Sequence, residues 1–191
     1  MATHEFVLGG QRSGKSRGAE ARAAAWLARD PEGSGHTAVL IATALAGDDE
    51  MRARIARHRA DRARRVAGLA TIEVPRDLAA ALRAYSAPHR LVLIDCLSLW
   101  LTNLLMPIEG EALADAALAD ARDGLRDALA TASGPVVLVS NEIGLGLVPL
   151  TREARRFVDE LGRLHQMVAA VCTNVTLMVA GIEVPVKRGR P

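Results

Sequence analysis

Short apolar runs alternate with longer segments of helical character along this chain of 191 residues. The apolar runs are rich in Val, Ile and Leu, whereas the segments between them are rich in Ala, Leu, Arg and Glu, which favour helices. The runs that predict strands are 6–8, 37–42, 71–74, 91–94, 136–139 and 175–179. The segments that predict helices are 15–29, 48–67, 77–84, 97–105, 111–132 and 151–172. This alternation is typical of a mainly parallel β-sheet covered by helices.

Turn-forming residues separate these segments at 30–35, 106–110 and 133–135. The chain has no internal repeat and no long linker, so we expect one domain spanning residues 1–191. The final segment, 186–191, is polar, and we expect it to be frayed.

Composition narrows the class of protein. Half of the residues are hydrophobic but only 3% are aromatic, which suggests Ala-rich helices packed closely on a sheet. The net charge of +2 does not by itself imply a nucleic-acid partner. Cys96 and Cys172 lack metal-ligand spacing and predict neither a disulfide framework nor a zinc site, which favours a reduced, cytoplasmic location. No apolar run approaches the ~20 residues that span a bilayer.

A phosphate-binding pattern lies between the first predicted strand and the first predicted helix. Residues 9–16 read Gly-Gly-Gln-Arg-Ser-Gly-Lys-Ser and fit Gly-x-x-x-x-Gly-Lys-Ser/Thr. Backbone N–H groups of such a loop converge on a triphosphate at the N-terminus of the helix. We expect Lys15 to contact the β- and γ-phosphates and Ser16 to bind Mg²⁺. The candidate phosphate-binding residues are Gly9, Gly10, Gln11, Arg12, Ser13, Gly14, Lys15 and Ser16. The sequence therefore predicts an α/β domain of the P-loop NTPase type with a RecA-like, mainly parallel sheet.

Acidic residues follow two of the predicted strands. Asp95 ends the run Leu-Val-Leu-Ile-Asp, where it can hold Mg²⁺ with Ser16 at the carboxyl edge of the sheet, or can simply cap the next helix. Glu142 follows the run that ends at Val139, and it either faces the same crevice or belongs to a plain turn.

The segment 48–65 begins with three acidic residues and then becomes densely basic. On a helix, Met51, Ile55, His58 and Arg62 share one face, which directs His58 toward the body of the protein. The histidine can be a packing residue there, and the arginines can form a solvated face or a nucleic-acid patch. Alternatively, a neutral imidazole among guanidinium groups can attack a nucleotide phosphate.

An ordered set of segments resembles one enzyme family over nearly the whole chain. These segments are 9–16, Ile-Ala-Thr-Ala (41–44), Asp-Asp-Glu-Met (48–51), Arg-Ile-x-x-His-Arg-x-x-Arg (54–62), Thr-Ile-Glu (71–73), Ile-Asp-Cys-Leu-Ser-Leu-Trp-Leu-Thr-Asn-Leu-Leu (94–105), Ser-Asn-Glu-Ile-Gly-Leu-Gly-Leu-Val-Pro (140–149) and Gly-Arg-Leu-His-Gln (162–166). They are similar to the bifunctional adenosylcobinamide kinase and adenosylcobinamide-phosphate guanylyltransferase of cobalamin biosynthesis. The sequence departs from that family at His165, where we expect Asn, and at Arg57, where some members carry a second histidine.

The resemblance implies two reactions at one nucleotide site. ATP or GTP phosphorylates adenosylcobinamide, and GTP then donates GMP to adenosylcobinamide phosphate through a covalent GMP–histidine intermediate. By match to the family motif, His58 is that histidine, with Lys15 as the second catalytic residue. Further nucleotide contacts implied in this way are Arg17, Ala44, Leu45, Ala46, Arg59, Arg62, Glu73 and Asp95. The resemblance also implies Mg²⁺ and a homotrimer.

Two other functions are compatible with parts of the sequence. One is a small-molecule P-loop kinase in which His58 only packs. The other is an NTP-regulated nucleic-acid-binding protein that uses the arginine-rich helix. The scarcity of aromatic stacking residues argues against the latter.

Overall fold

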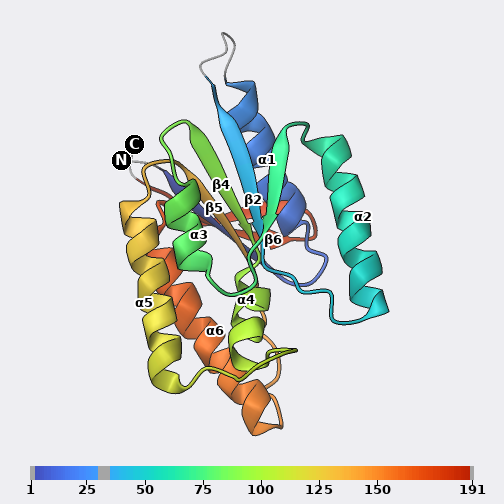
Figure 1. Ribbon diagram of the computed structural model, residues 1–191, viewed down its shortest axis with the longest axis vertical. Coiled ribbons are helices and arrows are strands. Elements are labelled where there is room, and N and C mark those ends of the chain that lie inside the picture. The colour runs from blue at the N-terminus through green and yellow to red at the C-terminus, as the bar shows by residue number, and fades with distance from the viewer. Residues whose placement is uncertain (1–2, 30–34, 190–191) are drawn as a thin grey trace.

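A seven-stranded β-sheet forms the centre of the molecule (Figure 1). The computed structural model describes residues 3–29 and 35–189. The strands are β1 (His4–Gly9), β2 (Thr37–Ala42), β3 (Leu69–Glu73), β4 (Arg90–Asp95), β5 (Val136–Asn141), β6 (Asn174–Val179) and β7 (Ile182–Lys187). Their order in the sheet is β3-β2-β4-β5-β1-β6-β7, and every pairing is parallel except that of β6 with β7.

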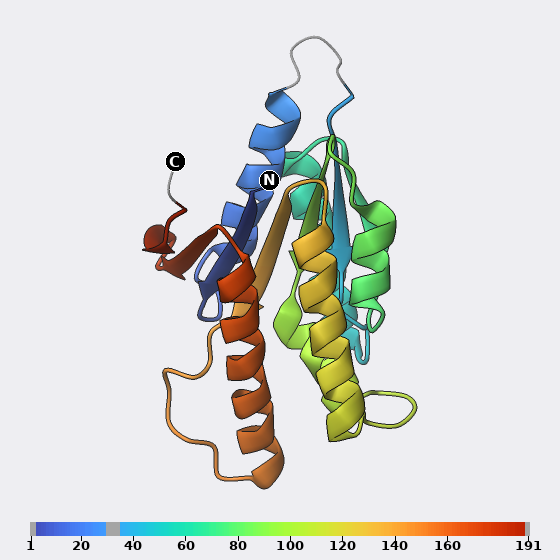
Figure 2. The same ribbon diagram turned by 90° about the vertical axis from the view of Figure 1, so that its left-hand side faces the viewer.

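Helices cover both faces of the sheet. They are α1 (Lys15–Ala28), α2 (Asp49–Arg65), α3 (Leu78–Tyr85), α4 (Leu97–Leu105), α5 (Asp115–Thr131) and α6 (Arg152–Val171). Helix α1 packs Ala19 and Ala23 on one face, and α3–α6 bury their apolar residues on the other, as the two views show (Figures 1 and 2). The fully buried alanines of α1 allow the close approach that the low aromatic content suggested.

The alternation of residues along each central strand explains these two layers. In β4, for example, Val92 and Ile94 belong to the core under α3–α6, whereas Leu91 and Leu93 belong to the core under α1. Successive side chains of a strand point to opposite faces, and a parallel sheet covered on both sides therefore needs continuous apolar runs.

The six predicted strands and six predicted helices are confirmed, with differences at their ends. The largest difference is that α5 begins at Asp115 rather than at 111. Thr151 is the cap of α6, where its side chain accepts a hydrogen bond from the Ala154 N–H, and Cys172 follows that helix. Of the predicted turn at 30–35, only Gly35 lies in the described residues.

The expectation of a frayed tail from 186 onward is wrong for Val186 and Lys187, which belong to β7. A tight turn at Ala180 and Gly181, with φ of 52° and 81°, joins β6 to β7. Two successive positive φ values match the twist of an antiparallel hairpin, and Pro185 is tolerated because β7 is an edge strand. Residues 190–191 lie outside the described residues.

The strand order brings the phosphate loop close to the other polar strand ends. Gly9 of β1 pairs with Asn141 of β5, and Asp95 of β4 pairs with Val139 of β5 and with Ala42 of β2. The carboxyl ends of β1, β5, β4 and β2 consequently meet at one edge, where ligands bind in open α/β sheets. No helix in the described residues is long and apolar enough to cross a membrane.

Candidate nucleotide site

The phosphate loop connects β1 to α1 and adopts a tight backbone conformation. Arg12 and Gly14 have positive φ values of 58° and 96°. The Ser13 N–H donates to the Gly10 carbonyl at 3.2 Å, and the Lys15 ammonium reaches back to that carbonyl at 3.0 Å. The loop thus has the curled form in which backbone N–H groups can converge on phosphate oxygens.

A pocket of about 190 Å³ opens beside this loop, between α2 and the carboxyl ends of the strands. Side chains from distant parts of the sequence line it. They are Gln11, Lys15, Ser16, Ala42, Ala44, Met51, Ile55, His58, Arg59, Arg62, Thr71, Glu73, Asp95, Cys96, Leu99 and Asn141. Lysine and arginine side chains of this pocket outnumber its two carboxylates, so the pocket suits an anionic ligand.

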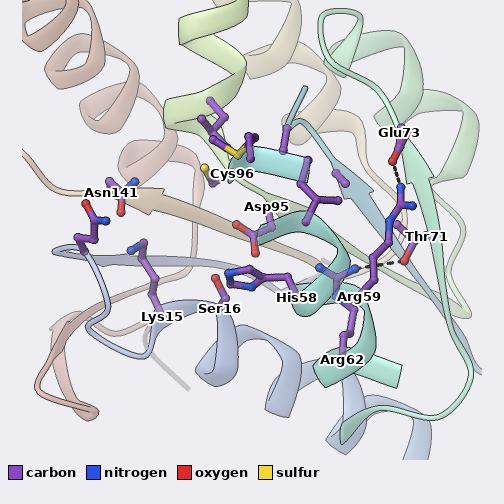
Figure 3. A pocket seen from close by; sticks show the side chains of 16 residues that line it. Lys15, Ser16, His58, Arg59, Arg62, Thr71, Glu73, Asp95, Cys96 and Asn141 are labelled. Carbon is purple, nitrogen blue, oxygen red and sulfur yellow. Dashed lines mark hydrogen bonds and ion pairs between the residues drawn. The ribbon is translucent and has the colours of Figure 1, made fainter. Parts of the chain in front are cut away.

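Helix α2 carries the histidine into this pocket. The Asp48 carboxylate caps the helix by accepting a hydrogen bond from the Met51 N–H at 2.7 Å. Met51, Ile55 and His58 lie on one face, as their spacing predicts, and all three line the pocket. Figure 3 shows the His58 imidazole pointing toward Ser16 and Asp95.

Two arginines of α2 are held on the strand side of the pocket. Arg59 forms an ion pair with Glu73 of β3. Arg62 donates to the Thr71 hydroxyl at 3.4 Å and is 9% exposed (Figure 3). Both guanidinium groups therefore contact residues of β3 that line the pocket with them.

Asp95 lines the pocket and does not cap the following helix. The N-cap of α4 is Cys96, and no side chain caps that helix end. Thr43 fixes the backbone here, because its hydroxyl donates to the Cys96 carbonyl at 2.7 Å and accepts from the Cys96 N–H at 2.9 Å. Burial raises the pKa of the Cys96 thiol to about 11, so the thiol stays protonated at neutral pH.

Glu142 turns away from the pocket toward α6. Its carboxylate lies 3.4 Å from His165 Nδ1 and accepts a hydrogen bond from the Gly144 N–H at 2.6 Å. His165 Nε2 lies 2.8 Å from the Ser140 hydroxyl, and the ring contacts Phe6 edge-on. Burial lowers the pKa of His165, and the charge of Glu142 opposes that shift. Ser140, His165 and Glu142 together join the end of β5 to α6. Asn141, between Ser140 and Glu142 in the sequence, lines the pocket.

The two residues predicted to bind Mg²⁺ lie close enough in the structure to line one pocket. Ser16 and Asp95 line the same pocket, and Mg²⁺ commonly uses one or two protein oxygens together with substrate phosphates. No group of three or more His, Cys, Asp or Glu side chains in the described residues could hold a metal by itself. This donor set suits a nucleotide-borne ion.

Of the predicted site residues, the pocket brings together Gln11, Lys15, Ser16, Ala44, His58, Arg59, Arg62, Glu73 and Asp95. The remainder are not among its lining side chains: Gly9, Gly10, Arg12, Ser13, Gly14, Arg17, Leu45 and Ala46. The glycines and Ser13 shape the loop backbone, whereas Arg12, Arg17, Leu45 and Ala46 are exposed.

Sequence reasoning gave no site role to several lining residues, among them Thr71, Leu99 and Asn141. Asn141 lies two residues after the predicted strand 136–139, so the rule that sites form at carboxyl strand ends was sufficient to find it. Thr71 carried no comparable signal, because its position depends on how α2 lies against β3.

Comparisons with known proteins cover almost the whole chain. The family model of cobinamide kinase / cobinamide phosphate guanyltransferase matches residues 5–186. The chain is 48% identical over 187 residues to the bifunctional adenosylcobalamin biosynthesis protein CobP of Pseudomonas aeruginosa, with 98% of both chains covered. It is 39% identical to the bifunctional adenosylcobalamin biosynthesis protein CobU of Salmonella typhimurium, covering 95% of this chain and 98% of that protein.

A solved structure shares the fold alone. The flagellar accessory protein FlaH of Methanocaldococcus jannaschii matches with a TM-score of 0.54 at 11% identity, covering 98% of this chain and 79% of that one.

Proposed function

The chain belongs to the cobinamide kinase / cobinamide phosphate guanyltransferase family, and from that premise we propose that one pocket serves both reactions in turn. The protein is an enzyme of cobalamin biosynthesis with kinase and guanylyltransferase activities. Its substrates are ATP or GTP together with adenosylcobinamide, and then GTP together with adenosylcobinamide phosphate.

In the kinase step, the phosphate loop holds a nucleoside triphosphate with its γ-phosphate beside Lys15 and Ser16. The substrate hydroxyl attacks the γ-phosphorus, the bond to the β-phosphate oxygen breaks, and the nucleoside diphosphate leaves as the hydroxyl proton is released. Lys15 stabilises the charge that develops on the phosphate oxygens. Mg²⁺ held by Ser16 and Asp95 would neutralise charge on the β- and γ-phosphates.

In the transferase step, GTP presents its α-phosphate to α2. A neutral His58 nitrogen attacks the α-phosphorus, a P–N bond forms, and pyrophosphate leaves toward Lys15. The phosphate of the acceptor then attacks the same phosphorus, the P–N bond breaks, and adenosylcobinamide-GDP forms. Arg59 and Arg62 bind phosphate oxygens during both displacements.

The observation that carries this proposal is the shared pocket of His58, Lys15 and Ser16. A histidine with only a packing role would be expected among apolar side chains, whereas His58 lines a pocket with Lys15 and two arginines. Phosphoryl transfer by a small-molecule kinase requires the phosphate loop and Asp95 but does not require a histidine nucleophile.

The test is transfer of label from GTP to the protein. The protein is incubated with GTP labelled at the α-phosphate, without acceptor, and is then denatured. We expect label on the protein that is acid-labile and base-stable, as phosphoramidates are, and that is lost in His58→Ala.

Arg57→Ala, which changes the exposed neighbour of His58, is the matched control and should retain the label. Label that persists in His58→Ala would refute the assignment of the nucleophile. Loss of the kinase reaction together with guanylyl transfer in that variant would contradict the division of labour between His58 and the phosphate loop.

We also propose a cytoplasmic homotrimer. Cys96 and Cys172 are buried free thiols, which suits a reducing compartment. The segment 143–150 exposes Leu147 at 98% and Leu150 at 95%, an apolar surface of the kind that a second chain covers.

A further inference from the structure

We propose that Glu20 is a positioning residue for guanylyl transfer: it fixes α2, and with it His58, in register with the phosphate loop. This inference rests on the proposed role of His58. Glu20 lies outside the pocket, and none of the sequence motifs draws attention to it.

Glu20 is a buried carboxylate that α2 neutralises. Its side chain is 3% exposed. One oxygen accepts a hydrogen bond from Arg65 Nε at 2.8 Å, and the other lies 3.4 Å from Arg62 Nε. Arg62 Nε is itself buried and makes no aligned hydrogen bond, so the nearby negative charge is what compensates its burial.

The residues of the ion pairs share helix faces with the residues of the pocket. On α1, Ser16 and Glu20 are four residues apart and share one face. On α2, His58, Arg62 and Arg65 follow at intervals of four and three and also share one face. The two helices thus face each other at two levels: Ser16 and His58 line the same pocket, and one turn further Glu20 pairs with Arg62 and Arg65.

Apolar packing along α2 itself supplies little to hold the helix at that register, and its apolar anchor is Val66, which directly follows the helix and is buried in the core under α1. Among the α2 side chains that the structure describes, Arg62 alone is buried, while Met51 and Ile55 are half-buried at the pocket. Along its length before Val66, the helix is held by ion pairs at both sides, with Glu20 of α1 and with Glu73 of β3. Of these two carboxylates Glu20 is the buried one, and a buried pair is screened less by solvent.

The pairing also orients Arg62. Glu20 faces the Nε side of its guanidinium, which leaves Nη1 directed to Thr71 at the pocket. Removal of the carboxylate is expected to release the side chain and to let α2 shift along α1. A displacement of about 1 Å at a reacting group can slow a reaction by about 10²-fold.

The experiment measures the single-turnover rate at which His58 takes label from α-labelled GTP at saturation, in Glu20→Gln and Arg65→Ala. Arg65 lines no part of the pocket and is partly exposed, so its removal leaves the protein able to fold. Glu160→Gln is the matched control, because Glu160 of α6 pairs with Arg122 of α5 in a partly buried ion pair between two helices and lines no part of the pocket.

We expect both test variants to slow labelling by about 10²-fold while the dissociation constant of GTP changes much less. The double variant should be no slower than Glu20→Gln, because that substitution already breaks the ion pair that Arg65→Ala removes. Labelling of folded Glu20→Gln at the rate of the unsubstituted protein would overturn the inference.

A second measurement does not depend on guanylylation. Amide hydrogen exchange across residues 49–65 should become faster by about tenfold or more in Glu20→Gln, since loss of one partner of a buried ion pair is strongly destabilising. Unchanged exchange there would overturn the inference even if His58 proved not to be guanylylated. Failure of the proposed function would show separately, as absence of label in the unsubstituted protein.

Discussion

At the scale of single residues, the end of β1 leaves no space for a side chain. A Cβ atom on Gly9 would overlap the Ser13 hydroxyl and lie 2.7 Å from the Met178 carbonyl oxygen. One residue later, a Cβ atom on Gly10 would meet nothing within 4 Å. Two adjacent glycines of one motif therefore differ in their surroundings: Gly9 packs against β6, whereas Gly10 faces open space.

We predict that Gly9→Ala lowers the free energy of unfolding by about 1–3 kcal/mol, the usual range for overpacking. Gly10→Ala should unfold at the same denaturant concentration as the unsubstituted protein. Urea denaturation of the three proteins is the measurement. Equal destabilisation by both substitutions would contradict this prediction. It would show that glycine is required at position 9 by the loop backbone and not by the contact with Met178.

His165 predicts a dependence of stability on pH. Its folded pKa is lowered by burial, so between that pKa and the ordinary value of 6.5 the unfolded chain binds more protons than the folded one. Stability should therefore fall as the pH drops below 6.5 and stay flat above it. His4, whose pKa burial also lowers, contributes in the same range.

The check is chemical denaturation of the protein and of His165→Asn between pH 5 and 8. We expect the variant to lose less stability on acidification, because one of the two buried histidines no longer needs to stay neutral. Parallel curves for the two proteins would contradict this assignment and leave His4 as the source of the slope.

At the scale of elements, the β6–β7 hairpin supports the phosphate loop. The Gly181 N–H of its turn donates to the Ser13 carbonyl at 2.9 Å. Glu183 of β7 accepts hydrogen bonds from Arg22 of α1, which lowers the pKa of that carboxyl. A strand that is exposed along its whole length thus helps to fix the loop that is predicted to bind phosphate.

We predict that Gly181→Ala weakens GTP binding as well as stability. At φ of 81° an L-residue costs about 1–2 kcal/mol, and the strain falls on the turn that holds Ser13. Gly110→Ala is the control: its φ of 82° imposes the same strain in a turn that does not touch the loop. Both variants should melt at lower temperature, but only Gly181→Ala should raise the dissociation constant of GTP.

The prediction of elements from sequence succeeded where burial dictates the pattern. The central strands are continuous apolar runs because helices cover both of their faces. β7 was missed because it is exposed along its whole length and so lacks a continuous apolar run: residues 182–185 were assigned to no element, and Val186 and Lys187 were assigned to a frayed tail. The start of α5 was misjudged because residues 111–114 resemble a helix in composition although Ala114 is its cap.

At the scale of the whole molecule, the distribution of exposed apolar residues is uneven. The loop after β5 and strand β7 carry most of the large exposed hydrophobic side chains of the described residues, among them Leu145, Leu147, Val148, Leu150 and Ile182. Both regions lie on the same side of the molecule in Figure 2. A surface of this kind is typical of a protein–protein contact.

We predict a solution mass near three times the chain mass of 20.3 kDa by light scattering. Leu147→Ser combined with Leu150→Ser should shift the mass toward that of one chain, because both side chains would lose apolar burial between subunits. A mass of 20.3 kDa for the unsubstituted protein would exclude the homotrimer.

The sequence by itself determined the layered α/β fold, the phosphate loop and the histidine helix, since these depend on local spacing and on runs of residues that must be buried. Only the tertiary structure decided which strand ends meet, because strand order is set by contacts between residues far apart in the chain. It turned Asp95 from a possible helix cap into a pocket residue, directed Glu142 toward His165, and set Glu20 between two arginines of α2. The pairing of Glu20 depends on how α1 and α2 pack against each other, and the spacing of residues within one segment of the chain cannot predict that packing.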